Sequence, residues 1–275
     1  MKEEKTKENI NDNKTDPGVF KIIDSHFHIG KYVSSTFSKL YEGSDIKVAK
    51  DLNFKKIIFI HTGFFFNLDF GLKETIKFVK KYKDFAYAMV VYNPNHIEES
   101  INIIEEHYGK NNIVGIKMHP EDHRCFITDN KYEALWKIAE AKSIPIMSHT
   151  WNPDVPSKYQ KYADALLFEN IVKKYPGLKV VLGHAGAKDY YYCEVIKMLK
   201  RNREKNIFVD LAGDVLYEGM LEEFVGQTGS DNILFGTDLP WMDPLLNYIY
   251  VRDAKIGIKD KENIFYENSR KLFNL

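Results

Sequence analysis

Two histidines stand two residues apart in the segment "DSHFHIG" (24–30), directly after the apolar run "VFKII". Side chains two apart on a β-strand point to the same face, so a strand here would present the rings of His26 and His28 together. Imidazole nitrogens bind Zn²⁺ and similar ions, and catalytic zinc sites leave one position open. The spacing therefore indicates half of a metal site. Asp24 shares the alternation, and either fixes the tautomer of a ligand histidine or has a structural role.

Residues that can bind ions or move protons also end several later apolar runs. Taken singly, such a histidine is more often a hydrogen-bonded structural residue, such an aspartate often caps a turn, and such a lysine is often solvated or paired. Their joint occurrence at the ends of runs 1, 4, 5, 6 and 8 favours one shared site. The residues are Lys117 and His119 in "IVGIKMH", His149 in "IPIMSH", His184 in "KVVLGH" and Asp238 in "NILFGTD", with His61 in "KKIIFIH" as a weaker candidate.

Eight short β-rich runs recur along the chain, with segments of helical spacing between them. Strands that alternate with helices predict parallel pairing through right-handed crossovers, and eight such units in about 250 residues predict an α/β fold, the (β/α)₈ TIM barrel. An open doubly wound sheet is the alternative, and it is disfavoured because no GxGxxG or P-loop follows the first run. The predicted strands are 19–28, 55–61, 85–92, 113–119, 144–149, 179–184, 207–213 and 232–238, and the predicted helices include 71–84, 131–143 and 162–177.

The chain has 275 residues, which favours one large domain, and we predict a disordered polar tail over 1–18 followed by a single domain over 19–275. Its 39 basic and 39 acidic residues balance, which argues against nucleic acid and membrane surfaces as partners. The start of the chain has no apolar signal region, no run is long enough to cross a bilayer, and the two cysteines form no disulfide framework. We therefore expect a soluble, cytoplasmic protein. Because barrels often dimerise, a homodimer stays open.

The sequence resembles the amidohydrolase superfamily, in particular its amidohydrolase-related branch, which includes decarboxylase-like enzymes. The matching segments are "IIDSHFHIG", "GIKMHP", "IPIMSHT", "VVLGHAGA" and "ILFGTDLPW", and the likeness runs from about residue 20 to 275. The resemblance implies a TIM barrel with a metal at the mouth. It implies His26, His28, His149 and Asp238 as metal ligands.

The resemblance also implies roles for two further residues. His184 would sit beside a metal-bound water, or would bind a second ion in a binuclear site. Lys117 raises the binuclear possibility because a carbamylated lysine can bridge two ions. One divalent ion, with zinc favoured, is the preferred reading, and two would require carbamylation of Lys117. A free ammonium at Lys117 would instead attract a substrate carboxylate or phosphate.

The expected activity is metal-dependent hydrolysis of a small ester, lactone or amide. A bound ion would lower the pKa of water to about 7, Asp238 would move its proton, and His184 would orient the water or stabilise the oxyanion. The alternative is a decarboxylase of a small aromatic or unsaturated acid, since the ligand set does not separate the two reactions. A barrel that only binds a ligand is the third possibility. Lys117, His119 and Trp151 are the candidate substrate contacts, and loop aromatics would wall the pocket.

Overall fold

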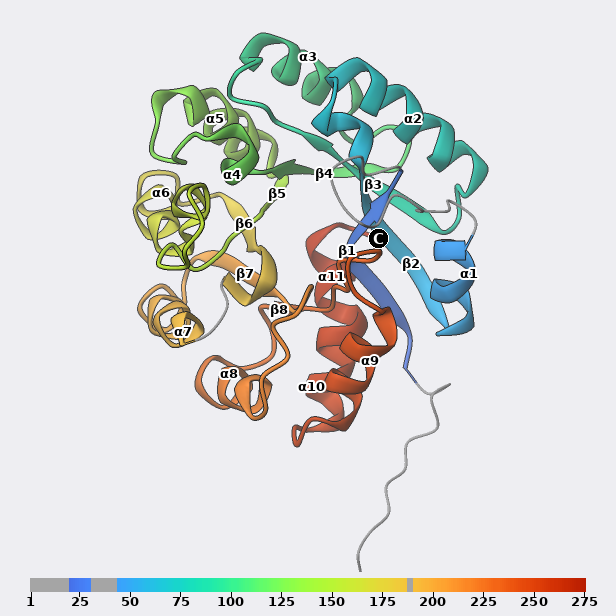
Figure 1. The fold of residues 1–275 in the computed structure, drawn as a ribbon, viewed down its shortest axis with the longest axis vertical. Helices are drawn as coiled ribbons and strands as arrows, with labels where there is room; N and C mark the ends of the chain where they lie inside the picture. The colour runs from blue at the N-terminus through green and yellow to red at the C-terminus, as the bar shows by residue number, and fades with distance from the viewer. Residues whose placement is uncertain (1–19, 31–43, 187–189) are drawn as a thin grey trace, which may run out of the picture.

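Eight parallel strands form one sheet in chain order in the computed structural model, which describes residues 20–30, 44–186 and 190–275 (Figure 1). All eight predicted strands are present, most of them one or two residues shorter than predicted. The tail over 1–18 lies outside the described residues, and the single domain over 19–275 stays a prediction. The strands are β1 (Ile22–Ile29), β2 (Phe54–His61), β3 (Ala86–Val91), β4 (Ile113–Met118), β5 (Pro145–Ser148), β6 (Lys179–Leu182), β7 (Asn206–Asp210) and β8 (Ile233–Leu234).

The segment around β8 returns to β1 and joins the two edges of the sheet. Backbone hydrogen bonds run from Ser25 N to the Phe235 oxygen at 3.0 Å and from Asp238 N to the His26 oxygen at 2.8 Å. A third runs from His28 N to the Leu239 oxygen at 2.8 Å. These bonds leave no free sheet edge at this point, so the predicted (β/α)₈ barrel is confirmed.

Helices pack around the outside of the barrel (Figure 1). The predicted helices over 71–84 and 131–143 correspond to α2 and α5, whereas 162–177 contains the shorter α6 after two 3₁₀ turns. The break comes at Asp164, which is extended and accepts a hydrogen bond from Leu166 N at 2.9 Å, so it starts a new turn. The helices are α1 (Ser44–Asp51), α2 (Leu68–Lys81), α3 (Ile97–His107), α4 (Pro120–His123), α5 (Glu133–Lys142), α6 (Phe168–Lys174), α7 (Tyr191–Arg201), α8 (Met220–Thr228), α9 (Pro244–Asp253), α10 (Ile258–Glu262) and α11 (Asn268–Leu272). Among the described residues, none of these helices combines the length and the apolar character that a bilayer crossing needs.

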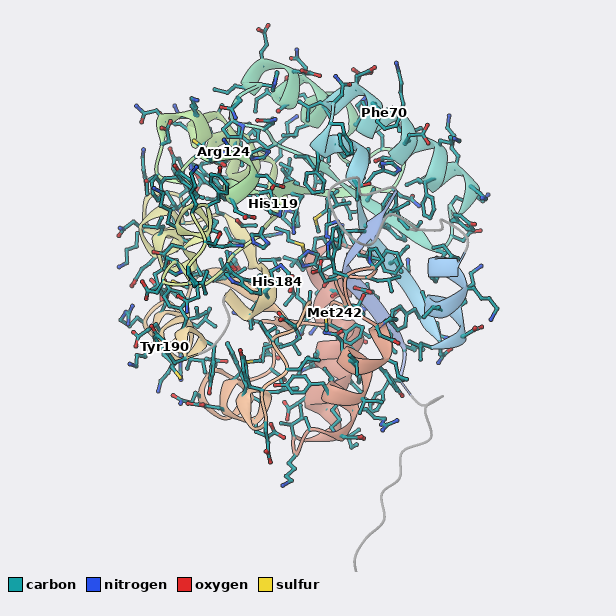
Figure 2. The ribbon with its side chains drawn as sticks, in the orientation of Figure 1. Phe70, His119, Arg124, His184, Tyr190 and Met242 are labelled. Carbon is teal, nitrogen blue, oxygen red and sulfur yellow. The ribbon has the colours of Figure 1, made fainter. Side chains whose placement is uncertain are left out.

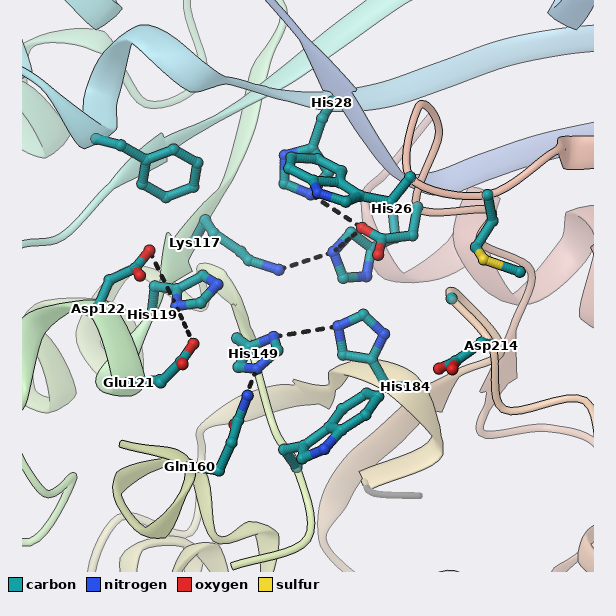
Figure 3. Close-up of a pocket in the computed structure, with 16 residues that line it drawn as sticks. His26, His28, Lys117, His119, Glu121, Asp122, His149, Gln160, His184 and Asp214 are labelled. Carbon is teal, nitrogen blue, oxygen red and sulfur yellow. Dashed lines mark hydrogen bonds and ion pairs between the residues drawn. The ribbon is translucent and has the colours of Figure 1, made fainter. Parts of the chain in front are cut away.

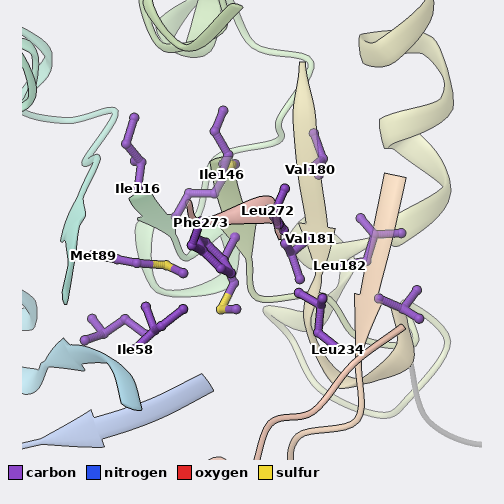
Figure 4. Close-up of a cluster of buried hydrophobic side chains, with 14 of the residues drawn as sticks. Ile58, Met89, Ile116, Ile146, Val180, Val181, Leu182, Leu234, Leu272 and Phe273 are labelled. Carbon is purple, nitrogen blue, oxygen red and sulfur yellow. The ribbon is translucent and has the colours of Figure 1, made fainter. Parts of the chain in front are cut away.

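The barrel interior away from the mouth is filled by aliphatic side chains and by the end of the chain. Figure 4 shows Ile58, Met89 and Ile116 facing Phe273, which follows α11. A Cβ added to Gly115 would lie 3.5 Å from the Phe273 ring, so the last residues pack against the amino-terminal half of β4. The strands read as continuous apolar runs because both of their faces are buried. The amino-terminal end of the barrel is therefore filled by side chains, and only the carboxyl-terminal end of the strands is free to form a pocket.

The buried carboxylate of Asp24 links β1 to the segment after β8. It accepts hydrogen bonds from the Thr237 hydroxyl at 2.6 Å and from Thr237 N at 3.2 Å. Thr237→Val keeps the shape and removes the hydroxyl, so we expect a loss of about 1–3 kcal/mol in the free energy of unfolding, measured by urea denaturation. Thr228→Val, which removes a hydroxyl from the end of α8, should change it by no more than about 0.5 kcal/mol. Equal effects of the two substitutions would contradict this prediction.

Candidate active site

A pocket of about 370 Å³ opens at the carboxyl ends of the strands. His119, His184 and Met242 lie around the barrel axis in Figure 2, whereas Phe70 and Tyr190 lie further out. The structure brings all eight residues predicted from the sequence to the wall of this one pocket. They are His26, His28, Lys117, His119, His149, Trp151, His184 and Asp238.

His26, His28 and Asp238 form a compact donor group on the wall of the pocket, where Figure 3 labels the two histidines. Strand β1 supplies both histidines, and Asp238 follows β8. Asp238 Oδ1 lies 3.2 Å from His28 Nε2 and 3.6 Å from His26 Nε2. One nitrogen or oxygen atom from each residue lies within 4.8 Å of the other two. Two imidazoles and a carboxylate at such distances are a donor set for a divalent cation.

His149 lies across the pocket from this group, although the resemblance places it in the same ligand set. Its ring stacks on His119, with centroids 4.2 Å apart and an interplanar angle of 8°. Together with Glu121, these two histidines form a second donor group within the described residues. His149 Nδ1 lies 3.1 Å from His184 Nε2. The structure therefore places His149 at the site, but not within the compact donor group.

Lys117 extends from β4 to the middle of the pocket, where its side chain is 1% exposed. Its Nζ lies 2.9 Å from His26 Nε2 (Figure 3). An ammonium can only donate hydrogen bonds, so His26 Nε2 must be the acceptor. Burial lowers the pKa of Lys117 to about 8, against the raising effect of nearby Asp210 and Asp238.

Aromatic rings wall the pocket above these polar groups. The Trp151 ring lies parallel to the His149 ring, with centroids 6.1 Å apart, and edge-on to the His184 ring, with centroids 5.4 Å apart. The Trp241 ring packs edge-on against His28, with ring centroids 4.6 Å apart, and the Phe65 ring packs edge-on against His119, with centroids 5.7 Å apart. The pocket therefore offers flat apolar surfaces beside a cationic and imidazole-rich floor, which suits a small planar ligand with an acidic group.

Asp210 is a buried residue of the site that the sequence analysis missed. It ends β7 with no exposed surface, and its Oδ2 lies 2.9 Å from His26 Nδ1. Its Oδ1 accepts the backbone N–H of His184 at 2.9 Å and of Ala212 at 3.1 Å. The available signal was an aspartate at the end of the apolar run "IFVD", the same pattern that singled out His149 and Asp238.

Asp24 and His61 both make structural contacts, which is one of the two roles that the sequence left open for each. Asp24 does not reach a histidine ring, because its oxygens bind the Thr237 hydroxyl, Thr237 N and His26 N. A register shift in β1 between Asp24 and Phe27, relative to β2, breaks the simple alternation on which that expectation rested. His61 has a structural contact, since its Nδ1 accepts the Gly63 N–H at 3.0 Å.

Burial and charge give the compact donor group suitable protonation states. Burial lowers the pKa of His26 to about 4, and Lys117 adds to this shift while Asp210 opposes it. Burial also lowers the pKa of His28. Burial alone would raise the pKa of Asp238, but the hydrogen bond from His28 and the surrounding histidines hold it well below its usual range. At neutral pH the imidazoles are neutral and the carboxylate is ionised, as cation binding requires.

Two pocket residues other than glycine have left-handed backbone conformations. His184 has φ 58° and Asp238 has φ 61°, values that are uncommon for residues other than glycine. Such strain is retained only where surrounding contacts enforce it, and it gathers at functional sites. Here the His184 peptide is held by Asp210 and the Asp238 peptide by the His26 carbonyl, so β1 and β7 enforce both conformations.

The barrel and its pocket define a class by geometry, that of α/β barrels whose mouth carries histidine and carboxylate groups that could hold a cation. A family model described as Amidohydrolase matches residues 73–275, so the chain belongs to the amidohydrolase family, as its sequence motifs predict. A curated relative is the gamma-resorcylate decarboxylase of Polaromonas sp. (strain JS666 / ATCC BAA-500), which is 26% identical over 180 residues. That match covers 53% of this chain, and the chain spans about half the length of the relative (55%).

Solved structures with the same fold include decarboxylases of aromatic acids. The 5-carboxyvanillate decarboxylase of Sphingomonas paucimobilis superposes with a TM-score of 0.74 at 12% identity, covering 93% of this chain and 99% of that chain. A dihydroxybenzoic acid decarboxylase from Polaromonas sp. JS666, with bound manganese and the inhibitor 2-nitroresorcinol, gives a TM-score of 0.72 at 16% identity. That superposition covers 93% of this chain and 97% of the other chain. At these identities, the likeness establishes the fold.

Proposed function

We propose that this protein is a metal-dependent decarboxylase of a small aromatic carboxylic acid. The observation that carries the proposal is the buried Lys117 ammonium, which lies in an aromatic-walled pocket directly beside the donor group His26, His28 and Asp238. A cation site and a carboxylate-binding group next to each other suit an anionic planar substrate. The sequence analysis preferred hydrolysis. The names of the curated relative and of the solved structures instead support decarboxylation.

The compact donor group fits a divalent ion. Two ligands at about 2.0–2.1 Å from a tetrahedral zinc ion lie roughly 3.3 Å apart, close to the observed 3.2 and 3.6 Å. We propose that His26, His28 and Asp238 hold the ion, which is either Zn²⁺ or Mn²⁺. Zinc is the ion that the donor types favour, while manganese is the ion bound in the related dihydroxybenzoic acid decarboxylase.

We propose one ion per chain. The other facing nitrogen pair, His149 Nδ1 and His184 Nε2, is 3.1 Å apart and forms a hydrogen bond between two rings. A second ion there would need a further ligand, which carbamylation of Lys117 would supply. Metal content measured after dialysis in carbon dioxide-free buffer and again in bicarbonate distinguishes the two cases. One ion in both buffers supports the proposal, and two ions in either buffer would overturn it. A bicarbonate-dependent rise would indicate carbamylation of Lys117, and two ions in both buffers would indicate binding at His119, Glu121 and His149.

Lys117 couples the cation to the substrate. Its ammonium donates a hydrogen bond to the lone pair of His26 Nε2. A bound cation needs the same lone pair, so His26 Nε2 can bind either the ammonium or the cation, but not both. When the cation binds, Lys117 must find another acceptor. A substrate carboxylate beside the cation provides one, in a charge-assisted hydrogen bond. Cation and acid are therefore expected to bind together more tightly than either binds alone.

The reaction breaks one carbon–carbon bond and needs one proton. The bond between the ring and the carboxylate breaks, carbon dioxide leaves, and the electron pair stays on the ring carbon, which then takes a proton. A divalent cation at the donor group would neutralise negative charge on the substrate oxygens. We assign proton delivery to His184, which borders the pocket. Its Nε2 accepts from His149 Nδ1 at 3.1 Å in the resting site, and it would carry the delivered proton once the ring is protonated to the imidazolium. Trp151 and Trp241 would keep the ring in place and exclude water.

Hydrolysis remains a second candidate because of Asp238. Its pKa is held well below the usual range, so the group is a carboxylate ready to accept a proton from water. Lys117 and His119 would then contact an acidic portion of the ester, lactone or amide. This candidate needs the same cation, and it differs in the bond that breaks.

The test uses the purified full chain, stripped by a chelator and reloaded with Mn²⁺ or Zn²⁺. We expect carbon dioxide and the decarboxylated phenol from at least one acid in a panel of hydroxybenzoates and methoxy-hydroxybenzoates, and only in the loaded protein. Stripped protein and protein loaded with Mg²⁺ serve as controls. Ester or lactone cleavage without carbon dioxide release would establish the second candidate instead, and metal-independent turnover would contradict both.

A further inference from the structure

Asp210 contacts two parts of the active site at once. Its Oδ2 lies 2.9 Å from His26 Nδ1, while its Oδ1 accepts the backbone N–H groups of His184 and Ala212 at 2.9 and 3.1 Å. The side chain is fully buried and does not border the pocket. It therefore acts through the two histidines that it holds.

The contacts of His26 determine which of its ring nitrogens carries the proton. A carboxylate oxygen only accepts, so the hydrogen bond at 2.9 Å requires a proton on His26 Nδ1. On the other side, Lys117 Nζ only donates, so Nε2 must be unprotonated. Two independent neighbours thus specify the same tautomer. That tautomer directs the Nε2 lone pair toward His28 and Asp238, where the compact donor group lies.

The second oxygen of Asp210 holds His184 in its left-handed conformation. His184 has φ 58°, and the Asp210 carboxylate accepts both the His184 and the Ala212 N–H groups. The Ala212 carbonyl in turn accepts from His184 Nδ1 at 3.1 Å, which leaves Nε2 as an acceptor beside His149. One carboxylate thus fixes the backbone of His184 directly and its ring through Ala212.

We propose that Asp210 is a positioning residue that sets the tautomer of His26 for cation binding and anchors His184 on the opposite side of the pocket. The proposal rests on the proposed function only in naming a cation as the ligand of His26. Outer partners of metal-binding histidines commonly raise affinity 10- to 100-fold by this means.

Asp210→Asn is the informative substitution because it keeps the shape. Its amide oxygen can still accept the two backbone N–H groups, which leaves the amide NH₂ facing His26 Nδ1. A donor at that position pairs only with an unprotonated Nδ1, and a proton on Nε2 then blocks the lone pair. The Lys117 ammonium opposes this change, so the substitution sets two donors against one ring. We expect the affinity for Mn²⁺ to fall by about 10- to 100-fold, measured by titration calorimetry on the full chain.

A spectroscopic readout on metal-free protein separates this role from a purely structural one. Two-bond ¹H–¹⁵N spectra of histidine-labelled protein report the tautomer of each ring, and the spectrum of His26→Gln assigns the signal. We expect wild-type His26 to carry its proton on Nδ1. In a Lys117→Met background, where no ammonium opposes the change, we expect Asp210→Asn to carry it on Nε2. The control Asp129→Asn also alters a carboxylate that accepts a backbone N–H, but on an exposed turn, and should change neither tautomer nor affinity.

The outcomes are distinct from those of the activity assay. A wild-type His26 protonated on Nε2 would overturn the proposal, even if Asp210→Asn failed to fold. A tautomer that Asp210→Asn leaves unchanged in the Lys117→Met background, with unchanged Mn²⁺ affinity in a folded Asp210→Asn protein, would overturn it as well. Both measurements are made without substrate, so failure to find carbon dioxide release would leave this result standing.

Discussion

Replacing Asp238 with asparagine should reduce the affinity for a divalent ion by more than about 100-fold and remove turnover with it. The effect should exceed the roughly 10- to 100-fold expected for an outer partner such as Asp210, because Asp238 supplies the only carboxylate of the compact donor group. A neutral amide cannot balance the charge of the cation, and its NH₂ group competes with the oxygen for the same position.

The fold should tolerate Asp238→Asn. Asp238 has φ 61°, and asparagine is among the residues that adopt this conformation most readily. Metal content, Mn²⁺ titration calorimetry and carbon dioxide release measure the effect, and thermal unfolding verifies the fold. The matched control is Asp243→Asn, on the same loop, where Asp243 caps α9 and asparagine caps equally well. Normal metal content in Asp238→Asn would refute the assignment of this residue as a ligand.

Replacing Lys117 with methionine should separate substrate binding from cation binding. Without the ammonium, the substrate carboxylate loses a charge-assisted bond, and we expect kcat/KM to fall on the order of 100-fold, within the range of about 1.5–3 kcal/mol for such bonds. The affinity for Mn²⁺ should stay the same or rise, because the lysine no longer competes for the lone pair of His26 Nε2. Methionine has a similar volume and needs no hydrogen bond, so stability should not fall.

This prediction also distinguishes the one-ion site from a carbamylated, two-ion site. In the two-ion case Lys117 is itself a ligand, and Lys117→Met would lose metal. Steady-state kinetics, metal content and titration calorimetry on the same preparation give the answer. Lys137→Met, on the outer face of α5, serves as the matched control and should leave all three unchanged. Loss of metal in Lys117→Met would contradict our account of how Lys117 acts.

The barrel and its eight strands could be predicted because each strand is buried on both faces and so forms a short apolar run in the sequence. The family could be predicted from the motifs around His26, Lys117 and Asp238, and the family model agrees. The preference for hydrolysis was weaker, because a donor set of imidazoles and a carboxylate serves several reactions. The related decarboxylases favour the alternative that the sequence analysis also named.

Several contacts within the site could not be predicted in this way. Asp24 was expected either at a histidine ring or in a structural role, and the structure gives it structural contacts, whereas Asp210 lies at the ring of His26. Asp24, next to the register shift in β1, binds Thr237, while β7 brings Asp210 to His26 Nδ1. Nothing in the local sequence around either aspartate distinguishes these outcomes, since both follow an apolar run.

The sequence by itself determined which residues reach the mouth of the barrel, because period-two alternation and parallel strands place strand-end side chains at one rim. Only the tertiary structure decided how these residues are grouped at the mouth. His26 and His28 form a donor group with Asp238, whereas His149 stacks on His119 across the pocket. The physical reason is that distances between side chains on different strands depend on register shifts, on closure of the sheet and on the left-handed backbone at His184 and Asp238. These are set by contacts between segments far apart in the chain, and no local pattern records them.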